Sequence, residues 1–210
     1  MQNLNVDVKR ETYEFHKEVL LPRTWTITQL SDLCEILDGQ RIPIEESERK
    51  KRKGMYPYYG ASGIIDYMDG FIFNERLLCL AEDGENLRSR VLPVAFTIDG
   101  KTWVNNHAHV LRPKKEKTDH QYLEYFLNYK LFDNYLSFTA QPKLTQEAMR
   151  KIRIILPNIG EQQKIASILS KVDELIKKTD QLIEQTRRLK KGLMQRLFTK
   201  GIGHTKFKKT

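Results

Sequence analysis

Few acidic and histidine residues of this sequence have a spacing that could support catalysis. Glu48-Arg49-Lys50 has the bare spacing of a metal-holding acid and lysine, but it lies inside a run of charged residues, not on a predicted buried strand. His107 and His109 lie two apart on a predicted strand and so point to one face, yet the nearby sequence offers no third partner for a metal or a proton relay. Glu82 and Asp83 are expected to be turn residues. No catalytic site is predicted.

Cofactor and metal motifs are also missing from the sequence. A methyltransferase requires a glycine-rich turn for its cofactor and an acidic-aromatic tetrapeptide for the target base. Gly60-Ala61-Ser62-Gly63 is a lone glycine pair in a strand-rich region, and no such tetrapeptide occurs. Cys34 and Cys79 are far apart, which suits two buried reduced thiols better than a zinc site or a disulfide. We therefore expect no cofactor and no metal.

Cationic and aromatic residues favour a different chemistry, contact with DNA. Phosphates are contacted by Lys and Arg, and base edges by hydrogen-bonding side chains. The run Arg49-Lys50-Lys51-Arg52-Lys53 is followed closely by tyrosines, so charge and aromatic rings are interleaved, and we expect this run to contribute most. Further candidates lie in polar loops, and His107 and His109 are expected to be structural or DNA-facing. The candidate DNA-binding residues are Arg49, Lys50, Lys51, Arg52, Lys53, Tyr56, Tyr58, Arg88, Arg90, Lys101, Gln141 and Lys143.

The net charge of +9 is concentrated in the last quarter of the chain. Residues 1–159 contain 23 basic and 22 acidic residues, whereas residues 160–210 contain 13 and 5. From Arg187 onward there are nine basic residues and no acidic one. Such a segment attracts a polyanion, which could be nucleic acid, an acidic protein surface or a membrane face.

Short strands are predicted at intervals between Trp25 and Leu111, because β-branched and aromatic runs are separated by Gly and Pro. Asp99-Gly100 between two of these runs is a strong hairpin signal. Ile44 to Lys53 is expected to be a polar, charged segment. The predicted strands are Trp25–Thr28, Tyr56–Tyr59, Gly63–Tyr67, Phe71–Phe73, Leu77–Ala81, Phe96–Ile98, Thr102–Val104 and His107–Leu111.

The hydrophobic period then changes from two to between three and four. It predicts an amphipathic helix from Asp119 to about Leu136 and a short helix over Thr145–Arg150, with Thr145 as its N-cap. Ile152, Ile154 and Leu156 alternate as a strand.

A heptad repeat follows Gly160. One set of residues recurs every seven positions, a second set lies three residues after the first, and the pattern lasts about four repeats, which is typical of a coiled coil. A helix from Glu161 to about Thr199 is about 58 Å long at ~1.5 Å per residue. The apolar stripe of this helix must be covered from water. A partner helix would cover it, or alternatively the helix folds back onto the chain's own domain. The residues expected at the dimer seam are Ile165, Ile168, Val172, Leu175, Leu182, Leu189 and Leu193.

The junction before this helix resembles a known family. Gln141-Pro142-Lys143-Leu144-Thr145, Met149 to Pro157 and Glu161-Gln162-Gln163-Lys164-Ile165-Ala166 are similar to the passage from recognition domain to conserved helix in type I restriction–modification specificity subunits. Further resemblances occur at Leu21-Pro22 with Trp25, Leu30 to Leu33, Tyr58 to Gly63, Asn105 to Leu111 and Leu193 to Phe198. Together these segments cover about residues 20 to 205.

The resemblance implies a non-catalytic subunit that recognises half of a bipartite double-stranded DNA site. It also implies docking to methyltransferase subunits and, through them, to a restriction subunit. Family members usually carry two recognition domains, whereas this sequence carries one. The chain is then either a half-length subunit that forms a homodimer or the front half of a longer chain.

We therefore expect an α+β protein with a mixed-sheet target-recognition domain followed by one long C-terminal coiled-coil helix. The expected segments are a polar segment over residues 1–20, the recognition domain over 21–159, the dimerisation and spacer helix over 160–200 and a basic tail over 201–210. With no membrane-length apolar run and no signal peptide, a cytoplasmic protein without membrane contact is expected. Two alternatives remain: a scaffold whose basic helix binds an acidic protein without DNA recognition, and a methyltransferase fragment.

Overall fold

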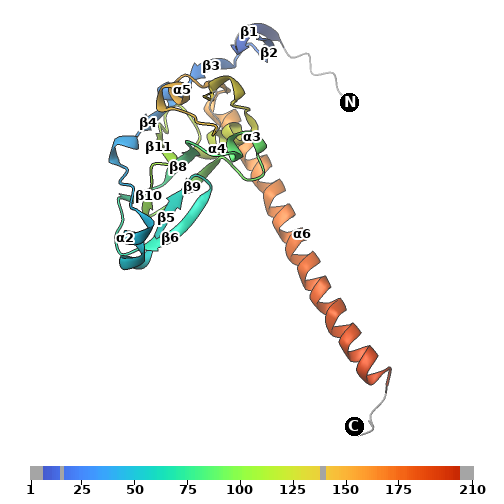
Figure 1. The fold of residues 1–210 in the computed structure, drawn as a ribbon. Helices are drawn as coiled ribbons and strands as arrows, with labels where there is room; N and C mark the ends of the chain where they lie inside the picture. Colours follow the sequence, from blue (N-terminus) through green and yellow to red (C-terminus); the bar gives the residue numbers. More distant parts are fainter. Residues whose placement is uncertain (1–6, 15–16, 138–140, 204–210) are drawn as a thin grey trace. The chain divides into compact units, whose positions relative to one another are not determined.

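The computed structural model describes residues 7–14, 17–137 and 141–203. The chain forms two compact units, Met1–Ala166 and Ser167–Thr210. The first unit contains every strand of the described residues, and the second contains most of the long helix α6 (Ile159–Lys200) (Figure 1). The predicted α+β class, with a mixed sheet and a long C-terminal helix, is confirmed.

The N-terminal segment contains more structure than its weak sequence pattern suggests. Strands β1 (Val8–Glu14) and β2 (Lys17–Pro22) pair as an antiparallel hairpin. The backbone N–H of Arg23 donates to the carbonyl of Asp7 at 3.1 Å. This hydrogen bond joins the two strands at the end of the hairpin away from its turn. The expected polar segment over residues 1–20 lies partly outside the described residues, as does the expected basic tail over 201–210.

The centre of the first unit is a four-stranded antiparallel sheet in the order β4-β11-β8-β9, here called the central sheet. All five side chains of β8 are buried because both of its faces are covered, which explains its uninterrupted apolar sequence. One face packs with helices α1, α4 and α5 and strand β12, and the other with residues of the second sheet. The strands are β4 (Cys34–Ile36), β8 (Leu77–Ala81), β9 (Ala95–Ile98) and β11 (Ala108–Pro113).

The second sheet, here called the end sheet, has the order β6-β5-β10-β7. Its β10–β5 pair is parallel and the other pairs are antiparallel, so this is the mixed sheet. A small core of Tyr58, Met68 and Trp103 lies beneath it. The strands are β5 (Lys53–Gly60), β6 (Gly63–Met68), β7 (Phe73–Asn74) and β10 (Lys101–Val104).

The predicted hairpin at Asp99-Gly100 is wrong. The turn itself forms, with Gly100 at φ +68° and its N–H donating to the Asp99 carboxylate at 2.9 Å. However, β9 pairs with β8 in the central sheet, whereas β10 pairs with β5 and β7 in the end sheet. The turn connects two sheets because a local turn signal does not specify the partners of the flanking strands.

The predicted helices are present with altered ends. Helix α4 (His120–Tyr129) stops before Leu136, because Lys130 adopts an extended conformation and a short 3-10 turn, η2 (Asp133–Tyr135), follows. Its N-cap is Asp119, which accepts from the N–H of Tyr122. Thr145 caps α5 (Gln146–Arg150), as predicted. The smaller elements are α1 (Leu30–Leu33), η1 (Asp38–Gln40), α2 (Glu46–Lys51) and α3 (Asn86–Ser89).

The last strand of the first unit leads directly into α6. Strand β12 (Arg153–Leu156) pairs antiparallel with β3 (Thr26–Gln29), so the two ends of the globular fold meet. Gln162 in the first turns of α6 is buried, and its Oε1 accepts from the N–H of Asp119 at 2.9 Å while its Nε2 donates to the carbonyl of Pro157 at 2.8 Å. Because Ala166 is also buried, the start of α6 is part of the globular unit.

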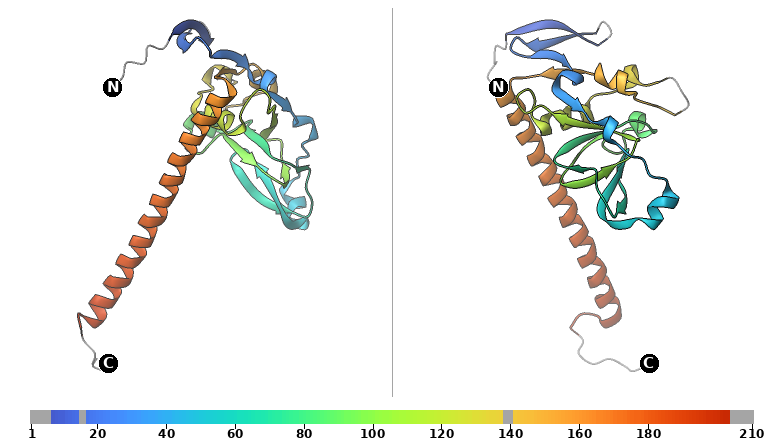
Figure 2. Two further views of the ribbon diagram at one scale, coloured as in Figure 1. Left: turned by 180° about the vertical axis from the view of Figure 1, so that it is seen from behind. Right: turned by 90° about the vertical axis from the view of Figure 1, so that its left-hand side faces the viewer.

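Within the second unit, α6 is one continuous helix (Figure 2). Most residues expected at the dimer seam are exposed: Leu175, Leu182 and Leu189 are each 63% accessible. A water-facing apolar stripe of this length agrees with the need for a partner helix inferred from the heptads. In the described part of the chain, no helix combines the length and apolarity needed to cross a bilayer.

Candidate nucleic-acid interface

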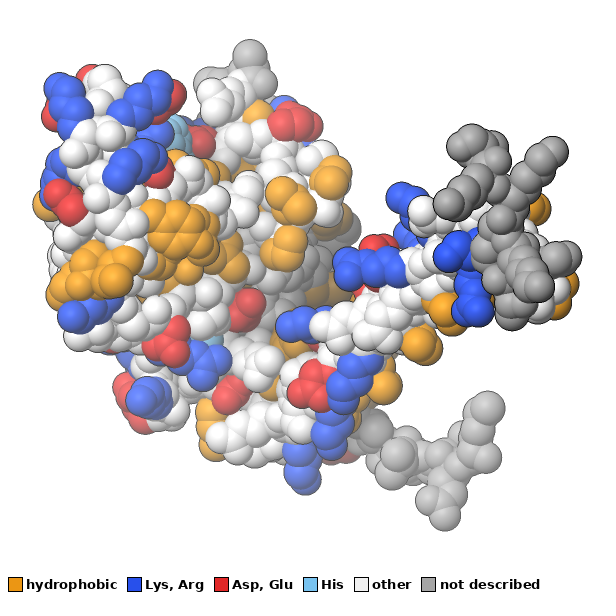
Figure 3. All heavy atoms as spheres, turned by 90° about the horizontal axis from the view of Figure 1, so that it is seen from below, with side chains coloured by type: hydrophobic (Ala, Val, Ile, Leu, Met, Phe, Trp, Pro, Cys, Tyr) orange, Lys and Arg blue, Asp and Glu red, His pale blue; other side chains and the backbone are white. Residues whose placement is uncertain are grey.

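The predicted basic run lies at one end of the globular unit, together with α2, β5 and β6 (Figure 1). We call the surface formed by residues 46–56, 69–71 and 101 the basic end. Its helix α2 begins with Glu46 and Glu48 and ends with Arg49, Lys50 and Lys51, an order that complements the helix dipole. Figure 3, which looks toward this part of the unit, shows hydrophobic side chains beside clustered Lys and Arg, with Asp and Glu interspersed.

Two lysines of α2 are the most accessible cations of the run. Lys50 pairs with Glu46 at 2.8 Å and Lys51 with Glu48 at 2.7 Å, and their side chains are 68% and 70% accessible. Exposed pairs of this kind contribute little to stability. The two ammonium groups can therefore exchange a carboxylate for a phosphate at small cost, which suits them to contact DNA.

Arg49 and Tyr58 have structural positions instead. The guanidinium of Arg49 donates to the carbonyl of Ile44 at 2.7 Å, lies 3.4 Å from Asp66 and is 5.2 Å from the centre of the Tyr58 ring. Tyr58 is only 1% exposed, and its hydroxyl accepts from the N–H of Ile44 at 3.0 Å. Tyr58 therefore supports the basic end from beneath, and a direct DNA contact by its ring is not compatible with this burial.

Arg52 and Lys53 lie at the surface but are held by acidic partners. The guanidinium of Arg52 pairs with Asp69 at 2.9 Å and is 5.2 Å from the centre of the Trp103 ring. Lys53 pairs with Asp66 at 2.5 Å, and this hydrogen bond is the main reason that the pKa of Asp66 is lowered. Because these contacts restrict both cations, their charges are presented in fixed places.

Tyr56 and Lys101 meet through a residue that was not predicted to take part. The Tyr56 and Phe71 rings meet edge to face at 5.2 Å, and the ammonium of Lys101 is 5.7 Å and 4.9 Å from their respective centres. Phe71 is 40% exposed. The basic end thus contains an accessible cation–aromatic cluster of a kind used to contact nucleic acid.

Four predicted residues lie on other elements. Arg88 is exposed on α3, whereas Arg90, at φ +53°, donates to the carbonyl of Lys130 at 2.5 Å and lies 4.6 Å from the Phe132 ring centre. Burial lowers the pKa of Arg90. Gln141 and Lys143 lie in the loop before α5, and Lys143 pairs with Glu82 at 3.2 Å. Arg90 is therefore largely a packing residue, and Lys143 remains half-exposed near the end of β8.

His109 has the third partner that nearby sequence did not reveal. Its Nδ1 is 2.6 Å from Asp38 and 3.7 Å from Glu82, and its Nε2 is 2.7 Å from the carbonyl of Leu144. Burial of Asp38 opposes ionisation, but hydrogen bonds from His109, Gln146 and the Val110 N–H lower its pKa. Both ring nitrogens of the fully buried His109 thus lie within hydrogen-bond distance of an oxygen, one of Asp38 and one of Leu144.

The same cluster does not suit a metal. Asp38, Glu82 and His109 place their ligand atoms within 4.8 Å of one another. However, Arg41 already pairs with Glu82 at 2.7 Å and lies 3.5 Å from Asp38, so the two negative charges are balanced by protein cations. Glu82 is thus a network residue, not only a turn residue. The network joins η1, β8, β11 and the loop before α5.

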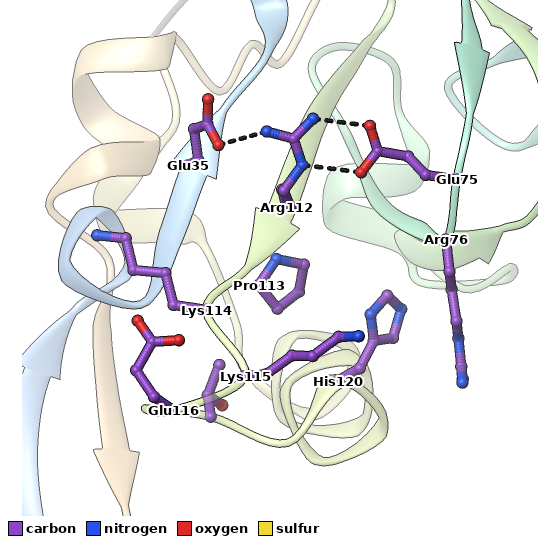
Figure 4. Close-up of a pocket in the computed structure, with 10 residues that line it drawn as sticks. Glu35, Glu75, Arg76, Arg112, Pro113, Lys114, Lys115, Glu116 and His120 are labelled. Carbon is purple, nitrogen blue, oxygen red and sulfur yellow. Dashed lines mark hydrogen bonds and ion pairs between the residues drawn. The ribbon is translucent and has the colours of Figure 1, made fainter.

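A hollow of about 600 Å³ lies between β11, the following loop and the start of α4 (Figure 4). In it Arg112 lies between Glu35 and Glu75 and is hydrogen-bonded to both, which raises its pKa. His120 is 2.8 Å from the Thr97 hydroxyl, and burial lowers its pKa to about 4, so it is neutral near pH 7. Because the guanidinium of Arg112 is already hydrogen-bonded to two carboxylates, it is poorly suited to bind an anion.

Cys34 and Cys79 are free and buried, as predicted. Burial raises the pKa of the Cys34 thiol to about 12 and also raises that of Cys79. Neither thiol is ionised near neutral pH, so neither is a ready nucleophile.

This fold and basic end define a class: a globular unit with a cation–aromatic surface, followed by a long helix with an unpaired apolar stripe. Residues 22–185 match the family model of the type I restriction modification DNA specificity domain. The chain belongs to this family, and the resemblance found in the sequence is confirmed.

Relatives of known name agree with this assignment. The chain is 38% identical to the putative MjaX specificity subunit of Methanocaldococcus jannaschii, over 96% of the chain and 52% of the relative. It is 30% identical to the MjaVIII specificity subunit of the same organism, over 96% and 48%. A putative specificity subunit of Haemophilus influenzae is 33% identical over 67% and 35%. The chain thus spans between about a third and a half of these relatives' length.

Solved structures show the same fold. The S subunit of a type I restriction-modification system from M. genitalium has a TM-score of 0.62 at 19% identity, covering 83% of this chain and 46% of that one. The HsdS subunit from Thermoanaerobacter tengcongensis has a TM-score of 0.55 at 17% identity, covering 87% and 46%.

Proposed function

We propose that this chain recognises a specific double-stranded DNA sequence through its basic end, as the specificity component of a type I restriction–modification complex. The observation that carries the proposal is that, in a DNA specificity domain, accessible cations lie at one end of the fold together with the exposed Phe71 ring and the half-buried Tyr56 ring. Lys50 and Lys51 contact phosphates, and Tyr56, Phe71 and Lys101 lie where bases or sugars are contacted. Arg49 and Tyr58 position these residues without touching DNA.

The remaining candidates have smaller parts in this proposal. Arg88, Gln141 and Lys143 extend the contact to phosphates beyond the basic end, since each is exposed or half-exposed. Arg90 holds the loop after α3 by its bond to Lys130 and its contact with Phe132. The Asp38–His109 network holds the loop that carries Gln141 and Lys143, because Leu144 accepts from His109.

The chain is also proposed to form a homodimer through α6. The observation in favour is the exposed stripe Ile168, Val172, Leu175, Leu182, Leu189 and Leu193. Two-fold symmetry places two recognition units in inverted orientation, so the target is two inverted half-sites with a spacer set by helix length. Because the chain spans about half of its relatives, the second unit could instead belong to a longer natural chain; the mass of the native protein separates the two cases.

Catalysis is assigned to other subunits. We propose that the chain itself is not an enzyme, and that it docks methyltransferase subunits and through them a restriction subunit. The names of its relatives, which are specificity subunits, support this division. Recovery of a methyltransferase subunit with the tagged chain from its native extract is the expected result; a chain recovered without one contradicts the docking.

Selection of duplexes from a random pool tests DNA recognition. The full chain is expected to enrich one sequence, arranged as an inverted repeat if the homodimer forms. Enrichment without any sequence preference argues for the rival, a scaffold whose basic helix binds an acidic protein. Enrichment of a single, unrepeated half-site would support DNA recognition by the chain and would contradict the homodimer.

A further inference from the structure

Strand β5 contains a bulge at Gly54 and Met55. Lys53 and Tyr56 are both opposite Met68 of β6, so the two residues between them have no partner in the ladder. A bulge of this kind redirects a side chain that would otherwise follow the alternation of the strand. Met55 lies in this bulge, and its side chain is 75% exposed.

Gly54 makes the bulge possible. A Cβ at this position would lie 2.2 Å from the carbonyl oxygen of Met68 and 2.5 Å from the Cα of Asp69. Both atoms are backbone and cannot move aside cheaply, because the N–H of Asp69 is bonded to the carbonyl of Arg52 at 3.0 Å. Only glycine fits here, so the bulge that contains Met55 depends on Gly54.

The sequence neighbours of Met55 are cationic and aromatic. Lys51, Arg52 and Lys53 precede it, each paired with a carboxylate, and Tyr56, which follows it, belongs to the cluster with Phe71 and Lys101. Single exposed apolar side chains are common and need no explanation by themselves. Here an unbranched apolar side chain is exposed on a glycine-dependent bulge, next to lysines that are proposed to contact phosphate. A DNA duplex has phosphates on its outside, which match the cations, and an apolar base stack inside, which matches the Met55 side chain.

We propose that Met55 is a wedge that enters between two base pairs of the bound duplex and partly unstacks them. This inference rests on the proposed DNA recognition by the basic end. Apolar side chains including Met are inserted between base steps by architectural proteins, and they kink the duplex. The wedge selects base steps that open easily, so Met55 contributes to specificity through deformability of the DNA, not through hydrogen bonds.

The test uses the full chain and a duplex that the chain itself selected from a random pool. Adenines of the site are replaced one at a time by 2-aminopurine, whose fluorescence rises when it is unstacked. The wild-type chain is expected to raise the fluorescence at one step. Met55→Ala is expected to abolish that rise and weaken binding on the order of tenfold, as expected for loss of a buried Met side chain. Met55→Leu is expected to restore most of both.

Val91→Ala is the matched control, because Val91 is a similarly exposed apolar residue (81%) on another loop. It is expected to leave the fluorescence and the affinity unchanged. Selective binding with no fluorescence rise at any step overturns the wedge while leaving DNA recognition intact. The same result accompanied by weaker binding when thymine is replaced by deoxyuridine assigns Met55 to contact with a thymine methyl group instead. Absence of selective binding by the wild-type chain overturns the proposed function itself.

Discussion

Gln162 accepts a hydrogen bond from the backbone N–H of Asp119 at 2.9 Å, and so joins the first turns of α6 to the N-cap of α4. The same side chain accepts from the Thr118 hydroxyl and donates to the carbonyl of Pro157. Because Gln162 is 1% exposed, these partners have no access to water as a replacement. The Glu161-Gln162 motif of the family-like junction thus has a physical role.

Gln162→Ala is therefore expected to destabilise the globular unit by about 1–3 kcal/mol for each buried polar group left unsatisfied. Chemical denaturation monitored by tryptophan fluorescence measures the change. Gln163→Ala is the control, since the neighbouring glutamine is exposed, and it should leave the free energy of unfolding unchanged. Equal changes in the free energy of unfolding for the two substitutions would show that the hydrogen bonds of Gln162 are unimportant for stability.

The free energy of unfolding should depend on pH in the acid range because of the carboxylate of Asp38. Although burial opposes ionisation, its folded-state pKa lies below the ordinary value of an aspartate, because His109, Gln146 and the Val110 N–H are hydrogen-bonded to its carboxylate. The associated stability is present above about pH 4 and is lost as the pH falls through the folded-state pKa. Asp38→Asn is expected to cost about 1–3 kcal/mol at pH 7, because it weakens the buried hydrogen bonds that the carboxylate accepts from His109, Gln146 and the Val110 N–H.

Urea denaturation at several pH values below 5 checks this expectation. The unfolding free energy of Asp38→Asn should fall less steeply with decreasing pH than that of the wild-type chain. Glu116→Gln should follow the wild-type profile, because Glu116 is exposed at the surface. Parallel profiles for Asp38→Asn and wild type contradict the assignment.

Charge reversal at the basic end should lower the affinity for DNA and should also make that affinity less dependent on salt concentration. Lys50→Glu with Lys51→Glu is expected to reduce the slope of log Kd against log salt by about two, since each phosphate contact contributes about 0.9. Lys151→Glu is the control, because Lys151 is also an exposed lysine in an i,i+4 pair, with Glu147. A slope unchanged by the double reversal removes α2 from the interface.

Disruption of the apolar stripe should separate dimerisation from folding. Leu175→Glu with Leu182→Glu is expected to convert a dimer into a monomer without altering the near-UV spectrum of the globular unit, because both residues are exposed on α6. Lys177→Glu, on the opposite side of the helix, should leave the mass unchanged. Sedimentation equilibrium measures the mass, and a double variant that stays dimeric assigns the contact elsewhere.

Local sequence patterns were informative where the cause of structure is local. Thr145 as an N-cap, the wholly apolar β8 and the heptads of α6 follow from short-range rules, and each is present in the structure. The early end of α4 was missed because the apolar period continues through Leu131 and Tyr135, although the backbone extends at Lys130. Periodicity records which side chains are buried, and it does not require that one helix buries them.

The site depended more on long-range contacts. Tyr56 and Tyr58 are two residues apart and share one face of β5, yet Tyr58 is buried in the core with Met68 and Trp103 while Tyr56 is half-buried. The partners of His109 are 71 and 27 residues away, at Asp38 and Glu82, so no nearby motif could reveal them. The bulge at Gly54 arises from pairing with β6, and Phe71 joins the cluster through tertiary packing. Charge and aromatic content indicated the surface, but not which members face outward.

The basic end is proposed to recognise a DNA sequence. The most direct measurement compares, at about 0.15 M salt, the affinity of the full chain for its selected duplex with its affinity for a scrambled duplex of the same composition. A preference on the order of 1,000-fold or more is predicted, as is typical of sequence-specific proteins, and it should fall when Lys50 and Lys51 are reversed. Equal affinities for the two duplexes would contradict the account.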